Sequence, residues 1–334
     1  MMVSPYKQGT IRRRRDHAEA AITIGELGEF GLIARVTSGY AQGNQVELGP
    51  GDDAAVLRAN GGLYVVSTDM YIERLHFRRD WSTAYDIGRR VAAASMADVM
   101  AMGAVPTGLL VSFAAPTDLE TRWTDDLNAG LHEECAAAGA SLVGGDVSRD
   151  DRIILAMTAL GDLAGREPVT RSGARPGDTL AVRGRVGWSA AGYAVLSRGF
   201  RSPRVLVEAH QRPEPPYAAG PEAADAGATA MCDVSDGLVQ DAGHIAARSG
   251  VGIDIARSAF CVPDEFHQVA AALGGADPMD WVLTGGEDHA LLATFPSEAS
   301  VPQGWRVIGQ VRDGSGVTVD GEPYEGTGWD HFRT

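Results

Sequence analysis

Short runs of apolar and β-branched residues alternate along this chain with stretches whose apolar residues recur at helical spacing. This alternation is the signature of an α/β protein, because the runs have the length of strands and the stretches between them the period of helices. The sequence predicts strands at 63–68, 109–113, 141–143 and 153–160 in the first half, and at 179–182, 252–255, 289–295 and 305–311 in the second.

The chain has 334 residues, enough for one large α/β unit or for two domains of ordinary size. The segment 161–177, rich in Gly, Arg and Pro, is the best boundary between two halves. We therefore expect a mobile tail at 1–22, an N-terminal α/β domain at 23–161 and a C-terminal α/β domain at 162–334.

Two helices have recognisable starts. Thr117 with Glu120, and Thr83 with Asp86, have the spacing of a capping box, in which two side chains bond the free backbone N–H groups at a helix N-terminus. In both cases apolar residues follow at helical spacing, so we expect a helix after each box.

The second of these helices has a carboxylate in its apolar stripe. At about 100° per residue, Asp98 projects between the directions of Ile87 and Val91 and close to Met102. An unpaired carboxylate is costly to bury. Three explanations remain open: a polar cavity at that turn, a bound cation, or an ordinary buried salt bridge.

Other aspartates occupy comparable places, at the ends of predicted strands or just before apolar or helical stretches. They are Asp52, Asp53, Asp69, Asp146, Asp233 and Asp236. Each alone is typical of a turn or an N-cap. Ligand sites in open α/β sheets form at strand ends and helix N-termini, so the recurrence favours one shared site. Carboxylates with the hydroxyls of Ser67 and Thr68, and almost no histidine nearby, suit Mg²⁺ better than zinc.

The lysine content excludes several enzyme classes, because the only lysine is Lys7, inside the predicted tail. A P-loop, a protein kinase and a pyridoxal enzyme each need a lysine in the folded domain. If the chain transfers phosphoryl groups, metal ions and arginine have to take the place of lysine. Arg171 is the best candidate for a phosphate clamp.

Charge and cysteine content restrict partners and compartment. A net charge of −15 argues against binding nucleic acid, which requires basic patches. No apolar run approaches the roughly 18 residues of a membrane span, and the N-terminus lacks the apolar core of a secretory signal. The cysteines are odd in number and form no CxxC pair, so we expect a reducing, cytoplasmic location.

Nine motifs in register make the sequence similar to the thiamine-monophosphate kinases of the aminoimidazole-ribonucleotide-synthetase-like superfamily. The resemblance covers nearly the whole chain, from GELGEF (25–30) to WDHF (329–332). The motifs are GPGDDAAV (49–56), STD (67–69), HF (76–77), ADVMAMGA (97–104), GGD (144–146), VTRSGARPGD (169–178), SAAG (189–192), DVSDGL (233–238) and GGEDHALL (285–292).

The resemblance implies a site. The metal ligands would be Asp53 (rather than Asp52), Ser67, Thr68, Asp69, Asp98, Asp146, Asp233 and Asp236. The residues contacting ATP would be Gly145, Asp146, Arg171 and Ser235. The residues holding thiamine monophosphate would be His76, Glu287 and Trp329, of which the carboxylate and the aromatic ring suit a flat, cationic thiazolium.

The resemblance also implies a two-domain fold with mixed sheets, N-terminal strands that pair across a homodimer, and an active site in the cleft between the domains. The expected reaction is Mg²⁺-dependent transfer of the γ-phosphoryl group of ATP to thiamine monophosphate, in line and without a dedicated catalytic side chain. Two departures from the family pattern affect the surroundings of the site: Ser95-Met96-Ala97 stands where the family has Asn-x-Ser, and His289 where it commonly has tyrosine.

Three alternatives remain. The chain could be another ATP-dependent enzyme of the superfamily, such as a synthetase with a different acceptor. It could be an Mg²⁺-dependent phosphohydrolase, which would release phosphate without making thiamine diphosphate. It could also bind ATP without turnover.

Overall fold

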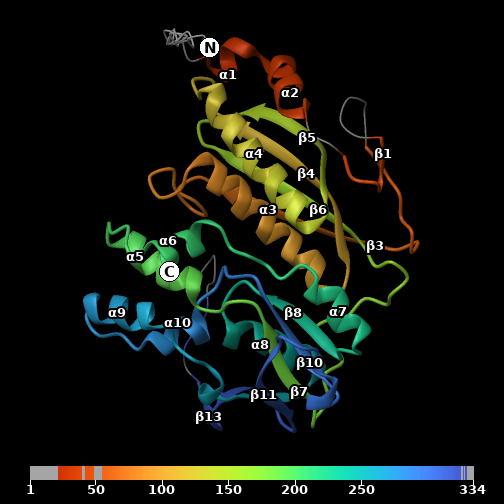
Figure 1. Ribbon diagram of the computed structural model, residues 1–334, viewed down its shortest axis with the longest axis vertical. Helices are drawn as coiled ribbons and strands as arrows, with labels where there is room; N and C mark the ends of the chain where they lie inside the picture. The colour runs from red at the N-terminus through yellow and green to blue at the C-terminus, as the bar shows by residue number, and fades with distance from the viewer. Residues whose placement is uncertain (1–21, 40–41, 49–54, 325, 327, 329–334) are drawn as a thin grey trace, which may run out of the picture.

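The computed structural model describes residues 22–39, 42–48, 55–324, 326 and 328, and they form two large β-sheets and a two-stranded ribbon, with helices packed around the sheets (Figure 1). The predicted tail lies almost entirely outside these residues. Among the described helices, none has both the length and the apolar character needed to span a membrane.

The first sheet has four strands in the order β3-β6-β4-β5, in which only β4 and β5 run parallel. Their bounds are β3 (Tyr64–Ile72), β4 (Val105–Ala115), β5 (Ser141–Arg149) and β6 (Ile154–Asp162). A separate ribbon pairs β1 (Val46–Leu48) with β2 (Val56–Leu57). The helices of this half are α1 (Ile24–Leu27), α2 (Glu29–Thr37), α3 (Ala84–Ala101) and α4 (Thr121–Ala138).

One face of this sheet is covered and the other is open. On β6 the residues Leu155, Met157 and Ala159 are fully buried against α3 and α4, whereas the alternate residues are only partly buried. On the edge strand β3 the outward-facing Val66 and Met70 are 59% and 57% exposed. An antiparallel sheet packed on one side normally carries polar residues on the other, so these apolar side chains need an explanation.

The second sheet has seven strands in the order β13-β12-β9-β11-β7-β10-β8, antiparallel except for β9 and β12. The strands are β7 (Thr179–Arg183), β8 (Ala230–Val234), β9 (Gly252–Ile255), β10 (Ala290–Phe295), β11 (Arg306–Arg312), β12 (Gly316–Val319) and β13 (Glu322–Pro323). The helices are α5 (Trp188–Ser197), α6 (Arg204–Gln211), α7 (Ala219–Asp225), α8 (Leu238–Ser249), α9 (Asp264–Ala272) and α10 (Pro278–Thr284), with short 3₁₀ turns at Arg257–Ala259 and Glu298–Ser300.

Helix α3 lies between the two halves and packs on both (Figure 1). Its Ile87 and Val91 belong to the core of the first sheet, while Ala97 and Met100 join Met231 of β8 in a second apolar cluster. A helix packed on both sides is apolar around most of its circumference, as α3 is. Any polar residue on α3 is therefore presented to a neighbouring element instead of to bulk water.

All eight predicted strands are present, although several are longer than their apolar runs, and β1, β2, β8, β12 and β13 were not predicted. The capping box at Thr83 and Asp86 is confirmed, with each side chain accepting from the other residue's backbone N–H. The box at Thr117 and Glu120 is wrong: α4 begins at Thr121 after an N-cap without a side-chain bond. The backbone of this segment pairs instead with the residues around α1, since the carbonyl of Thr117 accepts from Gly25.

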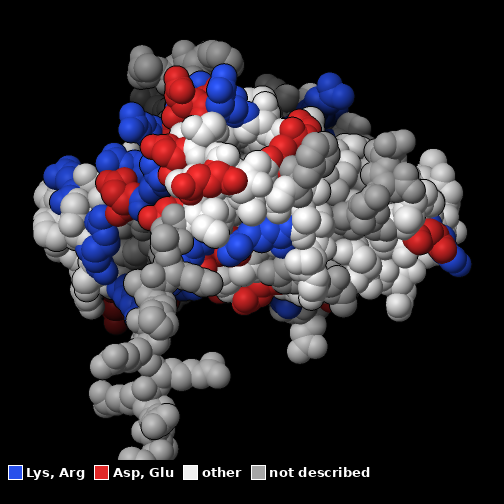
Figure 2. All heavy atoms as spheres, turned by 90° about the horizontal axis from the view of Figure 1, so that it is seen from above, with Lys and Arg blue, Asp and Glu red and all other residues white. Residues whose placement is uncertain are grey.

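Charged side chains of both signs lie next to one another on the end of the molecule seen from above (Figure 2). Arg35 on α2 and Asp125 on α4 form one exposed pair of opposite charge, with two hydrogen bonds between the side chains. Exposed pairs of this kind contribute little to stability individually.

Candidate active site

Three aspartates and a serine meet where α3 passes between β3 and β8. Ser67 on β3 donates a hydrogen bond of 2.6 Å to Asp98 on α3. Burial raises the pKa of Asp98 to about 7, and the nearby charges of Asp233 and Asp69 act in the same direction. Among the described residues Asp98 forms no ion pair, so the structure gives the salt-bridge explanation for this carboxylate no support. Asp98 instead faces other carboxylates.

Two further atoms of this group indicate what it could hold. Oδ2 of Asp69 is buried and has no hydrogen-bond partner among the described residues. Asp233 is buried near the end of β8, where it meets Nδ1 of His289 at 3.1 Å. Burial opposes protonation of His289, but the hydrogen bond to Asp233 and the charges of Asp233, Glu287 and Asp98 together outweigh it and raise the pKa of this histidine. A buried, unpartnered carboxylate oxygen among further carboxylates fits a hard cation.

The alternation of side chains along β3 divides the predicted ligands. Ser67 and Asp69 point toward α3, whereas Thr68 between them points to the open face and donates to the carbonyl of Met157. Asp69 was predicted to end its strand, but β3 continues to Ile72, so Asp69 lies in the strand interior. The chain therefore brings Ser67 and Asp69 together with Asp98 and places the Thr68 hydroxyl elsewhere.

Asp146 is not part of this group in a single chain. It also lies inside a strand, not after one, because β5 extends through it to Arg149. Successive pairings place it in one row with Met70, so its exposed side chain points to the open face. Since β3 and β5 are opposite edges of the sheet, three strand spacings separate Asp146 from Asp69, about 14 Å.

Gly145, beside Asp146, has no room for a side chain. A Cβ there would lie 1.9 Å from the carbonyl oxygen of Val111 on the neighbouring strand. Glycine is therefore required here by the close approach of the neighbouring strand, and the assignment of Gly145 and Asp146 to ATP stays a prediction.

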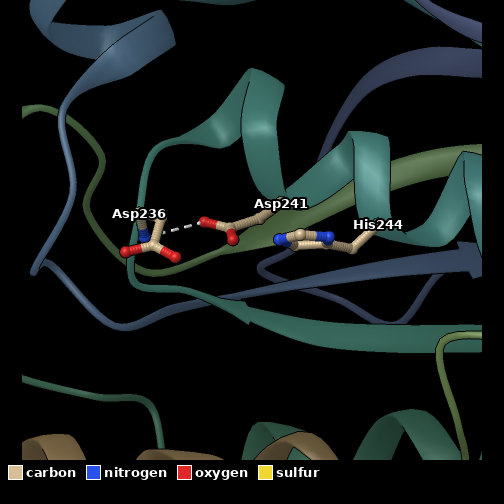
Figure 3. A group of neighbouring side chains, drawn as sticks. All are labelled: Asp236, Asp241 and His244. Atoms are coloured by element: carbon tan, nitrogen blue, oxygen red, sulfur yellow. Dashed lines mark hydrogen bonds between the residues drawn. The ribbon is translucent and has the colours of Figure 1, made fainter. Parts of the chain in front are cut away.

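The loop between β8 and α8 carries Ser235 and Asp236. Asp241, in the first turn of α8, accepts hydrogen bonds from the backbone N–H groups of Asp236 and Gly237 at 3.1 and 3.0 Å, so it fixes the shape of the loop (Figure 3). Burial raises the pKa of Asp241 to about 8, helped by Asp233 and Asp236. Ligand atoms of Asp236, Asp241 and His244 lie within 4.8 Å of one another, so this trio could also contribute to holding a cation.

Arg171, the predicted phosphate clamp, is exposed in the loop before β7. Its carbonyl accepts a hydrogen bond from Ser249, and among the described residues its guanidinium forms no ion pair. An uncommitted arginine on a loop is available for an anionic ligand.

Glu287 belongs to the second half of the chain. It lies in the loop before β10 with φ of 63°, and its backbone N–H donates to the carbonyl of Ser235. Its side chain is 48% exposed and hydrogen bonded to Arg90 on α3. Burial acts to raise the pKa of Glu287, but Arg90 and His210 outweigh it and lower the pKa to about 2.

His76 is linked through Tyr71 to both the carboxylate group around Asp98 and the Arg90–Glu287 pair. The two rings meet edge to face at 6.1 Å, and Nδ1 of His76 accepts from the backbone of Ile72. The hydroxyl of Tyr71 lies 3.3 Å from that of Ser95 on α3. Burial raises the pKa of Tyr71 well above its usual value, and the residues that also influence it include Asp69, Asp98 and Arg90. Tyr71 thus stands between the carboxylate group and the Arg90–Glu287 pair.

Three predicted site residues, Asp52, Asp53 and Trp329, lie outside the described residues.

The site residues predicted from the sequence do not include Arg90, His210 or Asp241. A signal existed for Arg90, because a helical projection places it about 80° from Asp98 on a helix that is otherwise apolar. Asp241 follows DVSDGL in the first helical turn, where an acidic residue is typical. His210 offered no signal, since its partner Arg90 is 120 positions away.

The two halves match two related families. Residues 51–163 match the AIR synthase related protein, N-terminal domain, and residues 175–322 the AIR synthase related protein, C-terminal domain. The chain is thus an AIR synthase related protein with both domains in order.

Whole-chain comparisons are more specific. The thiamine-monophosphate kinase of Mycobacterium tuberculosis strain H37Rv is 47% identical over 322 residues, covering 95% of this chain and 96% of the relative. A structure described as AaThiL complexed with AMPPCP and TMP superposes with a TM-score of 0.75 at 30% identity, covering 94% and 100% of the two chains. The thiamine monophosphate kinase of Aquifex aeolicus gives a TM-score of 0.73 at 32% identity, covering 78% and 89%. The chain belongs to the thiamine-monophosphate kinase family.

Proposed function

We propose that this chain transfers the γ-phosphoryl group of ATP to thiamine monophosphate and so produces thiamine diphosphate. The observation that carries the proposal is the carboxylate group Asp69–Asp98–Asp233 beside the Arg90–Glu287 pair, in a chain that matches thiamine-monophosphate kinases over nearly its full length. Acidic side chains suited to cations thus lie close to a carboxylate suited to an organic cation.

We propose that Asp69, Asp98 and Asp233, with Ser67, hold Mg²⁺. The buried, unpartnered Oδ2 of Asp69 and the all-oxygen donor set support this assignment. Bound Mg²⁺ would offset the repulsion between two anionic phosphates, which is about 4 kcal/mol for unit charges about 4 Å apart at an effective dielectric near 20. Asp236, together with Asp53, Thr68 and Asp146 in the assembled enzyme, completes the proposed ligand set.

The proposed reaction needs no dedicated base. A phosphate oxygen of thiamine monophosphate attacks the γ-phosphorus in line, and the bond between that phosphorus and the β-phosphate oxygen breaks to release ADP. The chain's own contribution is to position the reactants: Arg171 and Ser235 at the nucleotide, and His76, Glu287 and Trp329 at thiamine. Glu287, kept ionised by Arg90, suits the positive charge of the thiazolium.

We also propose that the active form is a homodimer. Val66 and Met70 expose apolar surface on the open face of the first sheet, and Thr68 and Asp146 point to the same face. Because Asp69 and Asp146 lie at opposite edges of one sheet, a site that uses both needs a second copy whose strands lie beside the first. The open face that would pair thus carries Thr68 and Asp146, which the single chain leaves apart from Asp69, Asp98 and Asp233.

We propose that the enzyme acts in the cytoplasm. Its three cysteines, Cys135, Cys232 and Cys261, all lie within the described residues and are free thiols. Free thiols suit a reducing compartment.

The direct test is to incubate the purified chain with ATP, Mg²⁺ and thiamine monophosphate and to follow thiamine diphosphate by chromatography. We expect product that disappears with EDTA and with Asp98→Asn. Phosphate release without thiamine diphosphate would favour a phosphohydrolase, and an untouched acceptor with ATP consumed would favour another superfamily reaction. Inversion at a chiral γ-phosphate is expected for direct transfer, whereas retention would indicate a phosphorylated enzyme intermediate.

A further inference from the structure

Arg90 is a buried cation whose partners lie in the other half of the chain. It projects from α3 with its side chain 9% exposed, and its guanidinium bonds Glu287 in the loop before β10. A second arm of the same guanidinium reaches Nε2 of His210 at 3.0 Å and the carbonyl of His210 at 3.2 Å. The fork geometry of arginine allows it to hold both partners in fixed relative positions.

His210 is itself held in place. Arginine only donates hydrogen bonds, so Nε2 of His210 has to accept and its Nδ1 carries the proton, which it donates to the hydroxyl of Ser189 on α5 at 3.0 Å. The backbone N–H of Ser189 donates to Asp288 at 2.8 Å, and Asp288 directly follows Glu287 in the chain. The contacts therefore form a closed ring that begins and ends in the loop carrying Glu287.

Glu287 differs from the other members of the ring because it is half exposed, at 48% of its side chain. The buried members fix the position and the charge of a carboxylate that keeps about half of its surface accessible. Its backbone is in the left-handed region, which an L-residue adopts only at a cost, so the loop itself does not favour this conformation. The ring supplies the contacts that maintain it.

We propose that Arg90 is a positioning residue for thiamine monophosphate: held by His210, it fixes Glu287 in the orientation in which the carboxylate contacts the cationic part of the substrate. This rests on the proposed function, in which Glu287 contacts the substrate. Arg90 touches neither the nucleotide nor the substrate. Its contribution is to thiamine monophosphate binding and not to ATP binding.

The test compares steady-state constants of Arg90→Gln, Arg90→Lys, Glu287→Gln and the double variant Arg90→Gln/Glu287→Gln. We expect Arg90→Gln to raise KM for thiamine monophosphate by about tenfold or more, which is what losing a charged hydrogen bond represents. KM for ATP should stay within about twofold of the parent value, because Arg90 acts only through Glu287. Arg90→Lys should recover part of the loss, and the double variant should be no worse than Glu287→Gln alone.

Arg212→Gln is the matched control. Arg212 also joins α3 to the second half, through an ion pair with Asp86 at 3.6 Å, but has no contact with Glu287 among the described residues. We expect its KM for thiamine monophosphate to stay at the parent value. An equal rise in both KM values for Arg90→Gln, or the same rise in Arg212→Gln, would show a general role in docking the two halves and overturn the proposal.

The remaining outcomes are also decisive. If Arg90→Gln does not fold, Arg90→Lys decides, and a KM for thiamine monophosphate equal to that of the parent refutes the positioning role. If Glu287→Gln leaves this KM unchanged, the assignment of Glu287 to the substrate fails and the proposal fails with it. If Glu287→Gln raises KM and Arg90→Gln does not, only the positioning role is refuted and the proposed function stands.

Discussion

The ion pair of Arg89 and Glu134 joins α3 to α4, and the loss of stability on removing Arg89 can be worked out from the structure. Glu134 is 2% exposed and bonds Arg89 on one oxygen, while the hydroxyl of Tyr217 donates to the other at 2.6 Å. Breaking a buried pair by removing one partner costs about 3–5 kcal/mol. Arg89 is 18% exposed and the Tyr217 bond remains, so we expect Arg89→Met to cost about 2–3 kcal/mol.

The assay is thermal unfolding followed by circular dichroism. At about 2.1 cal/mol/K per residue, a chain of 334 residues has an unfolding entropy near 0.7 kcal/mol/K, so the expected cost lowers the midpoint by about 3–4 °C. The matched control is the double variant Arg89→Met/Glu134→Met, which removes the stranded charge and should recover much of the loss. An unchanged midpoint in the single variant, or a double variant less stable than the single one, would refute the reasoning.

Three further predictions concern metal binding, pH and assembly. Asp69→Asn should abolish the Mg²⁺-dependent rise in unfolding midpoint that we expect for the parent chain, since only a bound ligand stabilises by mass action; differential scanning fluorimetry with and without Mg²⁺ tests this. Burial, assisted by Arg90, lowers the pKa of His210 to about 3 from 6.5, so below pH 6.5 the unfolded chain binds a proton that the folded chain does not. As the pH falls below 6.5, this group should therefore lower the free energy of unfolding by up to about 1.4 kcal/mol per pH unit. Urea titrations at pH 7 and pH 5 should show a smaller loss of stability in His210→Gln than in the parent chain. Met70→Asp should shift the chain toward monomer in analytical ultracentrifugation and reduce activity, whereas Leu75→Asp, equally exposed but beyond β3, should do neither.

The elements that the sequence revealed were those with a strong local pattern. Apolar runs located eight strands, and the capping box at Thr83 located the start of α3. Strand β8 was missed because its five residues include Asp233, which interrupts the apolar run. The false box at Thr117 shows the limit of such signals. The spacing matched a capping box, but the backbone of this segment is hydrogen bonded to the residues near α1 instead.

The site was predictable where one element carried the information. Asp98 was noticed because a helical projection places it in an apolar stripe, and the structure does give it carboxylate neighbours. The ring around Arg90 had no such signal, since His210 on α6 and Glu287 in the loop before β10 both lie far along the chain. Contacts between halves depend on how the halves dock, which no local period encodes.

The division of the ligand set shows which step from sequence to site needs the three-dimensional structure. Alternation along a strand already places Ser67 and Asp69 on one face and Thr68 on the other. The order of the strands in the sheet, however, cannot be predicted from the sequence of any single strand. This order places Asp69 and Asp146 at opposite edges of the first sheet. If both aspartates serve one reaction, the edge that carries Asp146 has to meet the site of another copy. The apolar residues Val66 and Met70 on the open face would then be buried by that same contact, so one assembly would account for both observations.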